Sequence, residues 1–472
     1  MKQLSGQDST FLYLERRGAH LNLTGLYVYR QPRAPHPPVR TRDVVRHVRE
    51  RLDAIPLFRQ KLLRPALDLD YPYWVDDPDF RLGNHIHRYR GRPPADRAGL
   101  YAAVARIHAT PMDFSRPPWA MHVIENPGPM EGLPRKCFAI ITRYHHAAID
   151  GASGMQLIHA LHDSRPAAGD RPPNERWSPA AAPGTIGVLA RAAVNNVARQ
   201  VRLARSVAGA APAMLRSVFQ GGDGAGSLPV PPTRFNAAIG ADRVFHAESV
   251  PLADVQAIRG AVPGSTVNDV MLTVCGGGLR SWLRARDELP EDSVVAMVPM
   301  NLRPSATADT QGNRVAMMAI PLHSDIADPL ARLRAVHEAA RRAKSSMISD
   351  GAADMQELID QVPAPALSTV GSLVSGLGLN RRLVRLFNCT VTNVPSPSGA
   401  LYLARGKLVY ATGAGPILDG MGLIVSLFTF QGKIDITLTS CPEMLPDPAA
   451  LGQCTRDAFT RLREAAQAAA AG

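Results

Sequence analysis

The sequence predicts an α/β protein with two domains, and three observations lead to that fold class. The chain has 472 residues, more than the roughly 100–200 residues of one ordinary domain. Strand-like and helix-like apolar patterns alternate in both halves. A proline- and alanine-rich stretch begins at residue 166, as expected of a linker. We therefore predict an N-terminal domain over residues 1–165, a linker over 166–240 and a C-terminal domain over 241–472.

Local patterns predict the elements of the first half. Ser5 and Asp8 resemble a capping box ahead of a short apolar helix over residues 10–14. Four further elements follow from apolar periodicity: strands over residues 20–29 and 136–145, and helices over 41–53 and 97–109.

The linker contains a long helical pattern that starts at Thr185, with no acidic residue between Arg176 and Gly222. At about 100° per residue, four arginines share an arc of about 120° and four apolar residues lie on the opposite side. These residues are Arg191, Arg199, Arg202 and Arg205, and Leu189, Val194, Val197 and Val201. Two interpretations stay open: the helix lies on an anionic lipid surface, or it bridges two domains with a solvated basic face. A flexible loop is predicted over residues 220–233.

The second half repeats the alternation of strands and helices. The segment GSTVNDVMLTVCGGGLRSWLRAR predicts a helix with Asn268 and Asp269 in its first turn. Gly276–Gly278 leave the middle of this helix without side chains. Each glycine costs about 1 kcal/mol of helix stability relative to alanine, so we expect another group to approach that face of the helix closely. The other predicted elements are strands at residues 243–250, SVVAMVPMNL, RVAMMAIPLH, NCTVTNVPSP, KLVYATGAG and GLIVSLFTFQGKIDITLTS, and helices over 328–347 and 448–470.

Composition limits the class of protein. Apolar residues make up 45% of the chain, but no apolar run approaches the ~18 residues of a membrane span. The segment MKQLSGQDSTFLYLERR lacks the features of a secretory signal, so we expect a cytoplasmic protein. The five scattered cysteines predict neither disulfides nor a zinc site. A net charge of +12 favours nucleic acid, an anionic membrane or a phosphate-rich cofactor as partner, although an arginine-rich proteome explains part of it.

Candidate chemistry lies in ITRYHHAAIDGASG, residues 141–154. Successive strand side chains point to opposite faces, so His145 and His146 cannot both serve one pocket. One is a candidate general base, because an imidazole with a pKa near 6.5 accepts a proton at neutral pH, and the other is expected to be structural. Asp150 would orient a ring or pair with a cation, and Gly151 gives backbone freedom and room for a substrate.

Three other interpretations compete with a histidine base. Two histidines and a carboxylate form a metal site in some iron enzymes, but adjacent strand side chains diverge. A packed pair without chemistry fits lone histidines better than two at a fixed spacing from Asp-Gly. A serine triad would need a G-x-S-x-G turn, which the chain does not contain. Direct transfer without a covalent enzyme intermediate is therefore favoured.

The histidine stretch resembles H-H-x-x-x-D-G, the active-site signature of an acyltransferase superfamily. It includes chloramphenicol acetyltransferase, the condensation domains of nonribosomal peptide synthetases, and the bacterial wax ester synthase/acyl-CoA:diacylglycerol acyltransferases. The motif alone does not separate these branches. Further segments resemble the last branch, in its order and over nearly the whole length: MKQLSGQDSTFLYLE, WVDDPDFRLGNHI, RPPWAMHVIE, VNDVMLTVCGGGLR, GNRVAMMAIPL, IADPLARLRAVHEA and TNVPSPSGALYLARGKL.

This resemblance implies two chloramphenicol acetyltransferase-like α/β domains with the active-site channel between them. It implies an O-acyltransferase that moves a long-chain acyl group from acyl-CoA to the hydroxyl of diacylglycerol or of a long-chain alcohol, making triacylglycerol or wax ester. Acyl-CoA is a co-substrate, and neither a cofactor nor a metal is implied. His146 is the expected general base, His145 and Asp150 would support its geometry, and Gly151 would keep the channel open.

Other family motifs supply further candidates. Asn268 and Asp269 match an Asn-Asp motif that would stabilise developing negative charge, although helix capping is an equal explanation for Asn268. Trp119 belongs to a Pro-Leu-Trp element and is either a substrate contact or a buried aromatic at a strand start. Asn393 and Pro395 match Asn-Val-Pro-Gly-Pro, in which serine here replaces the glycine.

The segment YATGAGPILDG departs from the family pattern and leaves acceptor preference open. Gly413, Ala414 and Gly415 are small where the family commonly carries tyrosine and proline. Asp419-Gly420 in the same segment echoes Asp150-Gly151 without the histidines, a weak sign of duplication.

Two rival functions come from different classes. A condensation-like enzyme would use a carrier-protein thioester, but the chain has no carrier or adenylation domain. A lipid-binding protein of the same fold would lack activity, which the intact histidine motif argues against. Nucleic-acid binding would need stacking aromatics, and only 6% of residues are aromatic. The lipid acceptors and the basic helix predict peripheral association with the inner face of the membrane or with lipid bodies.

Overall fold

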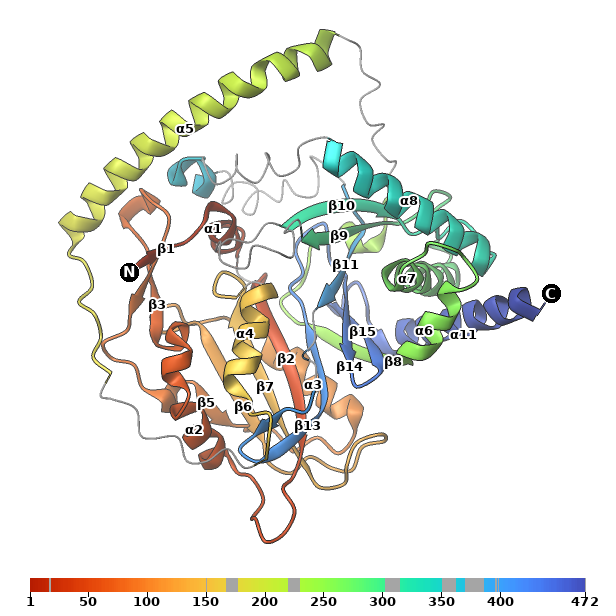
Figure 1. Cartoon of the computed structure of the whole chain (residues 1–472), viewed down its shortest axis with the longest axis horizontal. Helices are drawn as coiled ribbons and strands as arrows, with labels where there is room; N and C mark the ends of the chain where they lie inside the picture. The colour runs from red at the N-terminus through yellow and green to blue at the C-terminus, as the bar shows by residue number, and fades with distance from the viewer. Residues whose placement is uncertain are drawn as a thin grey trace.

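A computed structural model describes the chain except residues 17, 150, 167–176, 220–229, 302–314, 350–361, 370–385, 395–396, 398 and 472. Figure 1 shows two mixed α/β domains side by side, each built on a six-stranded sheet, so the predicted fold class is confirmed. A small sheet of β1, β4 and β3 lies beside the first domain; its strands span Lys2–Gln3, Tyr73–Asp76 and Gln60–Leu63.

The first six-stranded sheet has β2 and β7 at its centre. Its order is β12-β13-β2-β7-β6-β5, with strands spanning Tyr402–Leu403, Gly406–Ala414, Asn22–Arg30, Cys137–His145, Trp119–Ile124 and Ile86–Arg88. All nine residues of β7 are buried. Burial on both faces explains why this strand appears in the sequence as a continuous apolar run rather than an alternating one.

Helices cover both faces of this sheet. They are α2 (Thr41–Arg49), α3 (Arg97–His108) and α4 (Gly151–Leu161), whereas α1 (Gly6–Tyr13) packs beside the small sheet. One core contains Val44, Phe138 and Leu157 from α2, β7 and α4, and another contains Leu100 and Ile141 from α3 and β7. The predicted starts of α2 and α3 are confirmed. Helix α1 begins earlier than predicted, because Ser5 accepts the Asp8 backbone N–H at 2.9 Å and so caps a helix that starts at Gly6.

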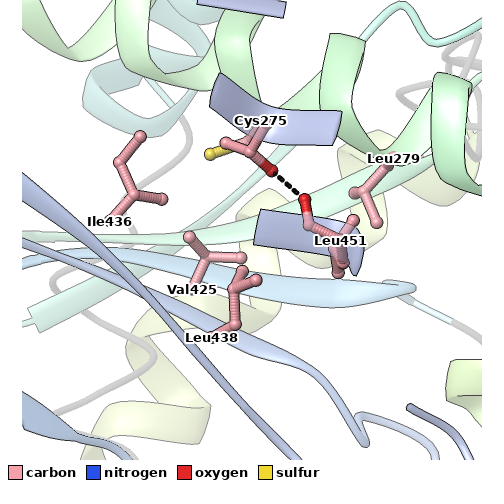
Figure 2. A pocket seen from close by; sticks show the side chains of 7 residues that line it. Cys275, Leu279, Val425, Ile436, Leu438 and Leu451 are labelled. Atoms are coloured by element: carbon pink, nitrogen blue, oxygen red, sulfur yellow. Dashed lines mark hydrogen bonds between the residues drawn. The ribbon is translucent and has the colours of Figure 1, made fainter. Parts of the chain in front are cut away.

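The second sheet has helices packed on one face. Its order is β10-β9-β11-β14-β15-β8, with strands spanning Val315–Pro321, Val295–Asn301, Cys389–Val394, Ile424–Phe430, Lys433–Ser440 and Val244–Pro251. The helices are α6 (Leu252–Arg259), α7 (Val267–Arg284), α8 (Pro329–Ser349) and α11 (Pro448–Ala471). Between α7, α11 and the sheet lies a cavity of about 10 Å³, lined by Cys275 and mostly aliphatic side chains (Figure 2). It is the size of one water molecule and too small for an acyl chain.

The second half of the chain contributes two strands to the first sheet. β12 and β13 come from the second half of the sequence but belong to the first sheet, where β13 pairs antiparallel with β2. Gly413 lies opposite Gly25, and a side chain at Gly413 would strike the Thr24 carbonyl. The small residues of this segment therefore permit close strand pairing.

The close approach expected at Gly276–Gly278 is confirmed, and its cause is packing within the domain. A Cβ on Gly277 would lie 2.6 Å from Nη1 of Arg332, and one on Gly278 would lie 2.5 Å from Oγ1 of Thr455. A Cβ on Gly276 would strike the Leu322 carbonyl. Helix α7 is thus packed on several sides, which explains why its middle tolerates three residues of low helix propensity.

The long linker helix is confirmed as α5 (Thr185–Phe219), which extends along the outside of the first domain (Figure 1). The predicted solvated basic face is wrong for Arg199, which is buried, pairs with Asp70 and lies 4.2 Å from the Tyr71 ring centroid. The side of α5 that contacts the protein also includes Val188, Ala192 and Asn195. Because this side of α5 is anchored by both apolar and polar contacts, the opposite side is left exposed.

The exposed side of α5 carries large apolar residues: Ile186, Leu189, Val194, Val197 and Val201. Side chains beyond residue 202 of this helix, including that of Arg205, lie outside the described set, as does most of the loop predicted over 220–233. In the described parts of the chain, no helix is both long and apolar enough to cross a membrane.

Candidate active site

The two histidines lie at the end of the central strand β7. His145 is its last residue and pairs in register with Asn22 of β2. The His145 backbone N–H donates to the Pro118 carbonyl at 3.1 Å, and that of His146 donates to the Leu21 carbonyl at 2.9 Å. Neighbouring chain segments on both sides therefore fix the backbone at the point where the strand ends.

The His145 side chain is fully buried and closely contacted. Its Nδ1 accepts the Ala147 backbone N–H at 3.2 Å, and the ring lies edge-on to Phe114 at 4.9 Å between centroids. Because Nδ1 is an acceptor, the ring carries its proton on Nε2. Nε2 lies 3.2 Å from Oε2 of Glu15, close enough for an electrostatic pair although not aligned for a hydrogen bond. These contacts give His145 the structural part that strand geometry predicts for one of the two histidines.

Glu15 is a further acidic residue beside the histidines, and it was not predicted from the sequence. Its carboxylate contacts Nε2 of His145 and lies 3.0 Å from Nδ1 of His20, and its side chain is 13% exposed. Burial would raise the pKa of Glu15, but the contacts with His145 and His20 outweigh it and lower the pKa to about 2. The carboxylate is therefore negative at neutral pH and faces two imidazoles.

His146 has a different environment from His145. It is half-buried, and its ring stacks on Phe11 of α1 with 3.8 Å between centroids and 22° between planes. Stacking fixes the plane of the imidazole while leaving ring surface accessible. The divergence of the two side chains is thus observed: one imidazole is enclosed, and the other is partly open.

The remainder of the motif is only partly described. Asp150 lies outside the described residues, and Gly151 begins α4. Leu157 and Leu161 of α4 pack into the core beside β7. The helix is therefore fixed close to the histidines through apolar packing of its later turns.

Asn268 and Asp269 lie in the first turn of α7, as predicted. Thr266 is the N-cap: its Oγ1 accepts the Asp269 N–H at 3.1 Å, and the Asp269 carboxylate accepts the Thr266 N–H at 2.8 Å. The same carboxylate lies 2.9 Å from Nδ1 of His337 on α8. The capping explanation therefore applies to Thr266 and Asp269. Asn268 is half-buried, and its side chain makes no hydrogen bond within the described part of the chain.

Comparison with known proteins identifies the family. The model of the wax ester synthase/diacylglycerol acyltransferase catalytic domain matches residues 4–271, and that of the family's C-terminal domain matches residues 311–463. The chain belongs to the wax ester synthase/diacylglycerol acyltransferase family. It is accordingly an O-acyltransferase that uses acyl-CoA.

Individual relatives of this acyltransferase extend over its whole length. Two Mycobacterium tuberculosis proteins, named as candidate diacylglycerol O-acyltransferases, are 28% and 30% identical; the alignments cover 95% and 100% of this chain, and 87% and 99% of those proteins. The solved wax ester synthase/diacylglycerol acyltransferase of Marinobacter aquaeolei is 25% identical with a TM-score of 0.69, covering 99% of this chain and 100% of that one. A starter condensation domain of rhizomide synthetase shares the fold alone, at 14% identity and a TM-score of 0.54, covering 99% of this chain and 94% of that one.

Trp119, in the Pro-Leu-Trp element of the family, lies in the core of the acyltransferase. It starts β6 and is buried, and its Nε1–H donates to the Phe58 carbonyl at 2.9 Å. The indole stacks between Phe58 at 4.0 Å and His85 at 4.5 Å. Trp119 is therefore a buried aromatic at the start of a strand, and a contact between Trp119 and substrate stays a prediction.

The family's Asn-Val-Pro segment begins at the end of β11. Asn393 is exposed on that strand, opposite Leu427 of β14, whereas Pro395 lies outside the described residues. Asp419, the echo of the motif aspartate, is buried and pairs with Arg16 at 2.9 Å from Nε to Oδ2. It also accepts the Ile239 N–H at 2.9 Å. In the second half, Asp-Gly thus anchors the chain through an ion pair.

Three residues that contact the histidines, Phe11, Glu15 and Phe114, were not predicted from the sequence. Phe11 and Glu15 belong to the segment SGQDSTFLYLE, which resembles the family. A carboxylate just after a short apolar helix was the one local signal, and it did not indicate which partner the carboxylate would meet.

Proposed function

We propose that this acyltransferase esterifies diacylglycerol, or a long-chain alcohol, with His146 as the general base. The observation that supports this assignment is the contrast between the two rings: His145 is enclosed and accepts a backbone N–H on Nδ1, whereas His146 is partly accessible and stacked on Phe11. A base must reach the acceptor hydroxyl, and an enclosed ring cannot.

In the proposed reaction, His146 takes the hydroxyl proton of the acceptor as its oxygen attacks the thioester carbon of acyl-CoA. The C–O bond forms, and the carbonyl oxygen becomes a tetrahedral oxyanion. Its collapse breaks the C–S bond, and the imidazolium returns the proton to the sulfur, so that CoA leaves as a thiol. No covalent enzyme intermediate is required.

The other motif residues have supporting parts in this proposal. The Glu15 carboxylate holds His145, which fixes the end of β7 and so the position of His146. We propose that Asp150 maintains this loop and that Gly151 leaves space for the acyl group between the two domains. Asn268 carries an amide that is not committed to the helix cap, which supports a role at the oxyanion. Trp119, Asp269, Asn393 and Pro395 stay substrate-binding candidates.

The test uses purified enzyme with palmitoyl-CoA and, in parallel, hexadecanol or dipalmitoylglycerol, following CoA release. His146→Ala should lower kcat by about 10²–10⁴, the usual contribution of a general base. His36→Ala, at an exposed histidine, is the matched control and should retain wild-type turnover. No CoA release above background with either acceptor would contradict the proposal. Near-normal turnover of His146→Ala with an inactive, folded His145→Ala would assign the base to His145 instead.

We also propose that the enzyme associates peripherally with an anionic membrane or lipid-body surface through α5. Ile186, Val194 and Val197 are 84%, 68% and 63% exposed, although apolar side chains of this size are normally buried. Arg191 and Arg202 are exposed along one edge of this apolar stripe, and the sequence has no carboxylate from residue 177 to 222. An apolar stripe with a basic edge matches the interface of an anionic bilayer.

Liposome flotation tests this association. An Ile186→Asp/Val194→Asp/Val197→Asp variant should lose binding to vesicles that contain phosphatidylglycerol, and neutral vesicles should bind the wild type more weakly. Leu67→Asp is the control, because Leu67 is 88% exposed and belongs to a different element. Equal flotation of the wild type and the triple variant would remove α5 from the proposal.

A further inference from the structure

Four arginines converge on a second cavity, which is remote in sequence from the histidine motif. The cavity has a volume of about 240 Å³ and lies where α7, the start of α8 and α11 meet. Arg280 and Arg284 come from α7, Arg332 from α8 and Arg461 from α11. No carboxylate side chain lines it.

Arg332 forms the floor of this arginine pocket. It is only 5% exposed, and its Nε donates to the carbonyls of His323 and Ile326 at 3.2 and 3.1 Å. Nη2 donates to the Ala327 carbonyl at 3.2 Å, which leaves Nη1 directed toward Gly277. Any side chain at Gly277 would collide with Nη1, so the glycine makes room for the guanidinium.

The other three arginines lie at the rim of the pocket. Arg280 and Arg461 donate to uncharged partners, and Arg284 is exposed. Nη1 of Arg280 donates to the backbone carbonyls of Ser324 and Asp325 at 2.7 and 2.9 Å. Nη2 of Arg461 donates to Oγ of Ser281 at 3.1 Å, and Arg284 is exposed. Within the described parts of the chain, none of the four makes an ion pair.

Burial and the neighbouring arginines lower the pKa of Arg332, the buried one of the four. Burial lowers the pKa of Arg332 first, and Arg280 and Arg461 lower it further, to about 10; Asp328 and Asp325 oppose the shift. The group still carries its proton at pH 7. The fold therefore maintains four positive charges around one cavity without a compensating carboxylate in contact.

We propose that the arginine pocket is a binding site for a phosphate group. Guanidinium groups bind phosphate oxygens through charge-assisted, often bidentate hydrogen bonds. Four guanidinium groups offer more hydrogen-bond donors than one carboxylate can accept. A phosphate group presents three terminal oxygens and can accept more of these hydrogen bonds. The volume accommodates a phosphate with a few attached atoms and is smaller than ordinary drug-sized pockets of about 300–1,000 Å³. The ligand is thus either free phosphate or the headgroup of an anionic lipid.

Binding is measured on the full chain by calorimetric titration with inorganic phosphate, at constant ionic strength set with chloride. The wild type should bind phosphate saturably, and Arg284→Gln/Arg461→Gln should weaken binding at least tenfold. These two arginines are exposed, so their replacement should leave folding intact; Arg332→Gln is a second variant, checked by its thermal unfolding. Arg334→Gln is the control, because Arg334 is exposed on the same helix and does not line the pocket.

Flotation with vesicles of phosphatidylcholine alone or with phosphatidic acid separates the two sources. Loss of phosphatidic-acid binding in Arg284→Gln/Arg461→Gln, with α5 unchanged, would assign the pocket to a lipid headgroup; phosphate binding without such a loss would assign it to free phosphate. If the double variant matches the wild type in both assays, or if chloride competes as well as phosphate, the proposal is wrong. Neither assay depends on turnover, so the result is independent of the role of His146.

Discussion

Replacing Glu15 by glutamine tests the contacts beneath the histidines, because it removes the charge and retains the shape. The pKa of Glu15 is lowered from 4.5 to about 2, and at ~1.36 kcal/mol per pKa unit this shift corresponds to about 3 kcal/mol of stability. The side chain is 13% exposed, so solvent screening reduces this value little. Because the folded-state pKa lies below the unfolded value, this contribution is complete above about pH 4.5 and is lost as the pH falls through about 2.

Urea unfolding of the wild type and Glu15→Gln from pH 6 to pH 3 measures this effect. Of the ~3 kcal/mol, about 2 kcal/mol should be gone by pH 3 in the wild type, and this loss should be absent from the variant. The two free energies of unfolding should therefore differ at pH 6 and approach each other on acidification. Glu131→Gln, at an exposed carboxylate, should run parallel to the wild type. A constant difference between wild type and Glu15→Gln over this range would refute the pairing with His145 and His20.

Four further substitutions separate structural from catalytic parts. Phe11→Ala removes the ring stacked on His146 and should lower kcat, measured by CoA release, roughly tenfold to hundredfold, in addition to a loss of stability from its packing beside Leu12 and Trp74; an unchanged kcat would mean that the stack does not position the base. Trp119→Phe leaves the Phe58 carbonyl without its donor and should cost about 1–3 kcal/mol in urea unfolding. If Trp119→Phe instead raises KM for the acceptor without loss of stability, the indole is a substrate contact. Thr266→Ala removes the N-cap of α7 and should cost about 1 kcal/mol, whereas Asn268→Ala should leave stability unchanged and lower kcat.

Local features were predictable because they depend on neighbouring residues. The continuous apolar run within residues 136–145 placed β7 to within one residue, and the alternation of strand side chains separated His145 from His146. The start of α2 at Thr41 followed from its apolar spacing in the same way. For α1, the capping pair of Ser5 and Asp8 was recognised, but the helix was started too late, since the residues between cap and apolar run are polar.

Features that depend on distant contacts were not predictable. The helical pattern of α5 separated its two sides correctly, but amphipathic reasoning assumes that the apolar side packs inward. Here Asp70 is buried and takes contacts from Arg199 and Asn195, and that polar anchor turns the apolar side outward. The pairing of β13 with β2 was likewise out of reach, because strand pairing across hundreds of residues leaves no local pattern.

The segment that supports both histidines is itself held by the second half of the chain. Phe11 stacks on His146 and Glu15 contacts His145, so α1 and the residues after it set the position of both rings. Directly after Glu15, Arg16 pairs with the buried Asp419, and the Gly18 carbonyl accepts Nη2 of Arg243 at 2.6 Å. The strand that carries the histidines belongs to one domain, whereas these anchors belong to the other. The geometry of the candidate base therefore depends on both halves being assembled, although the whole histidine motif lies in the first.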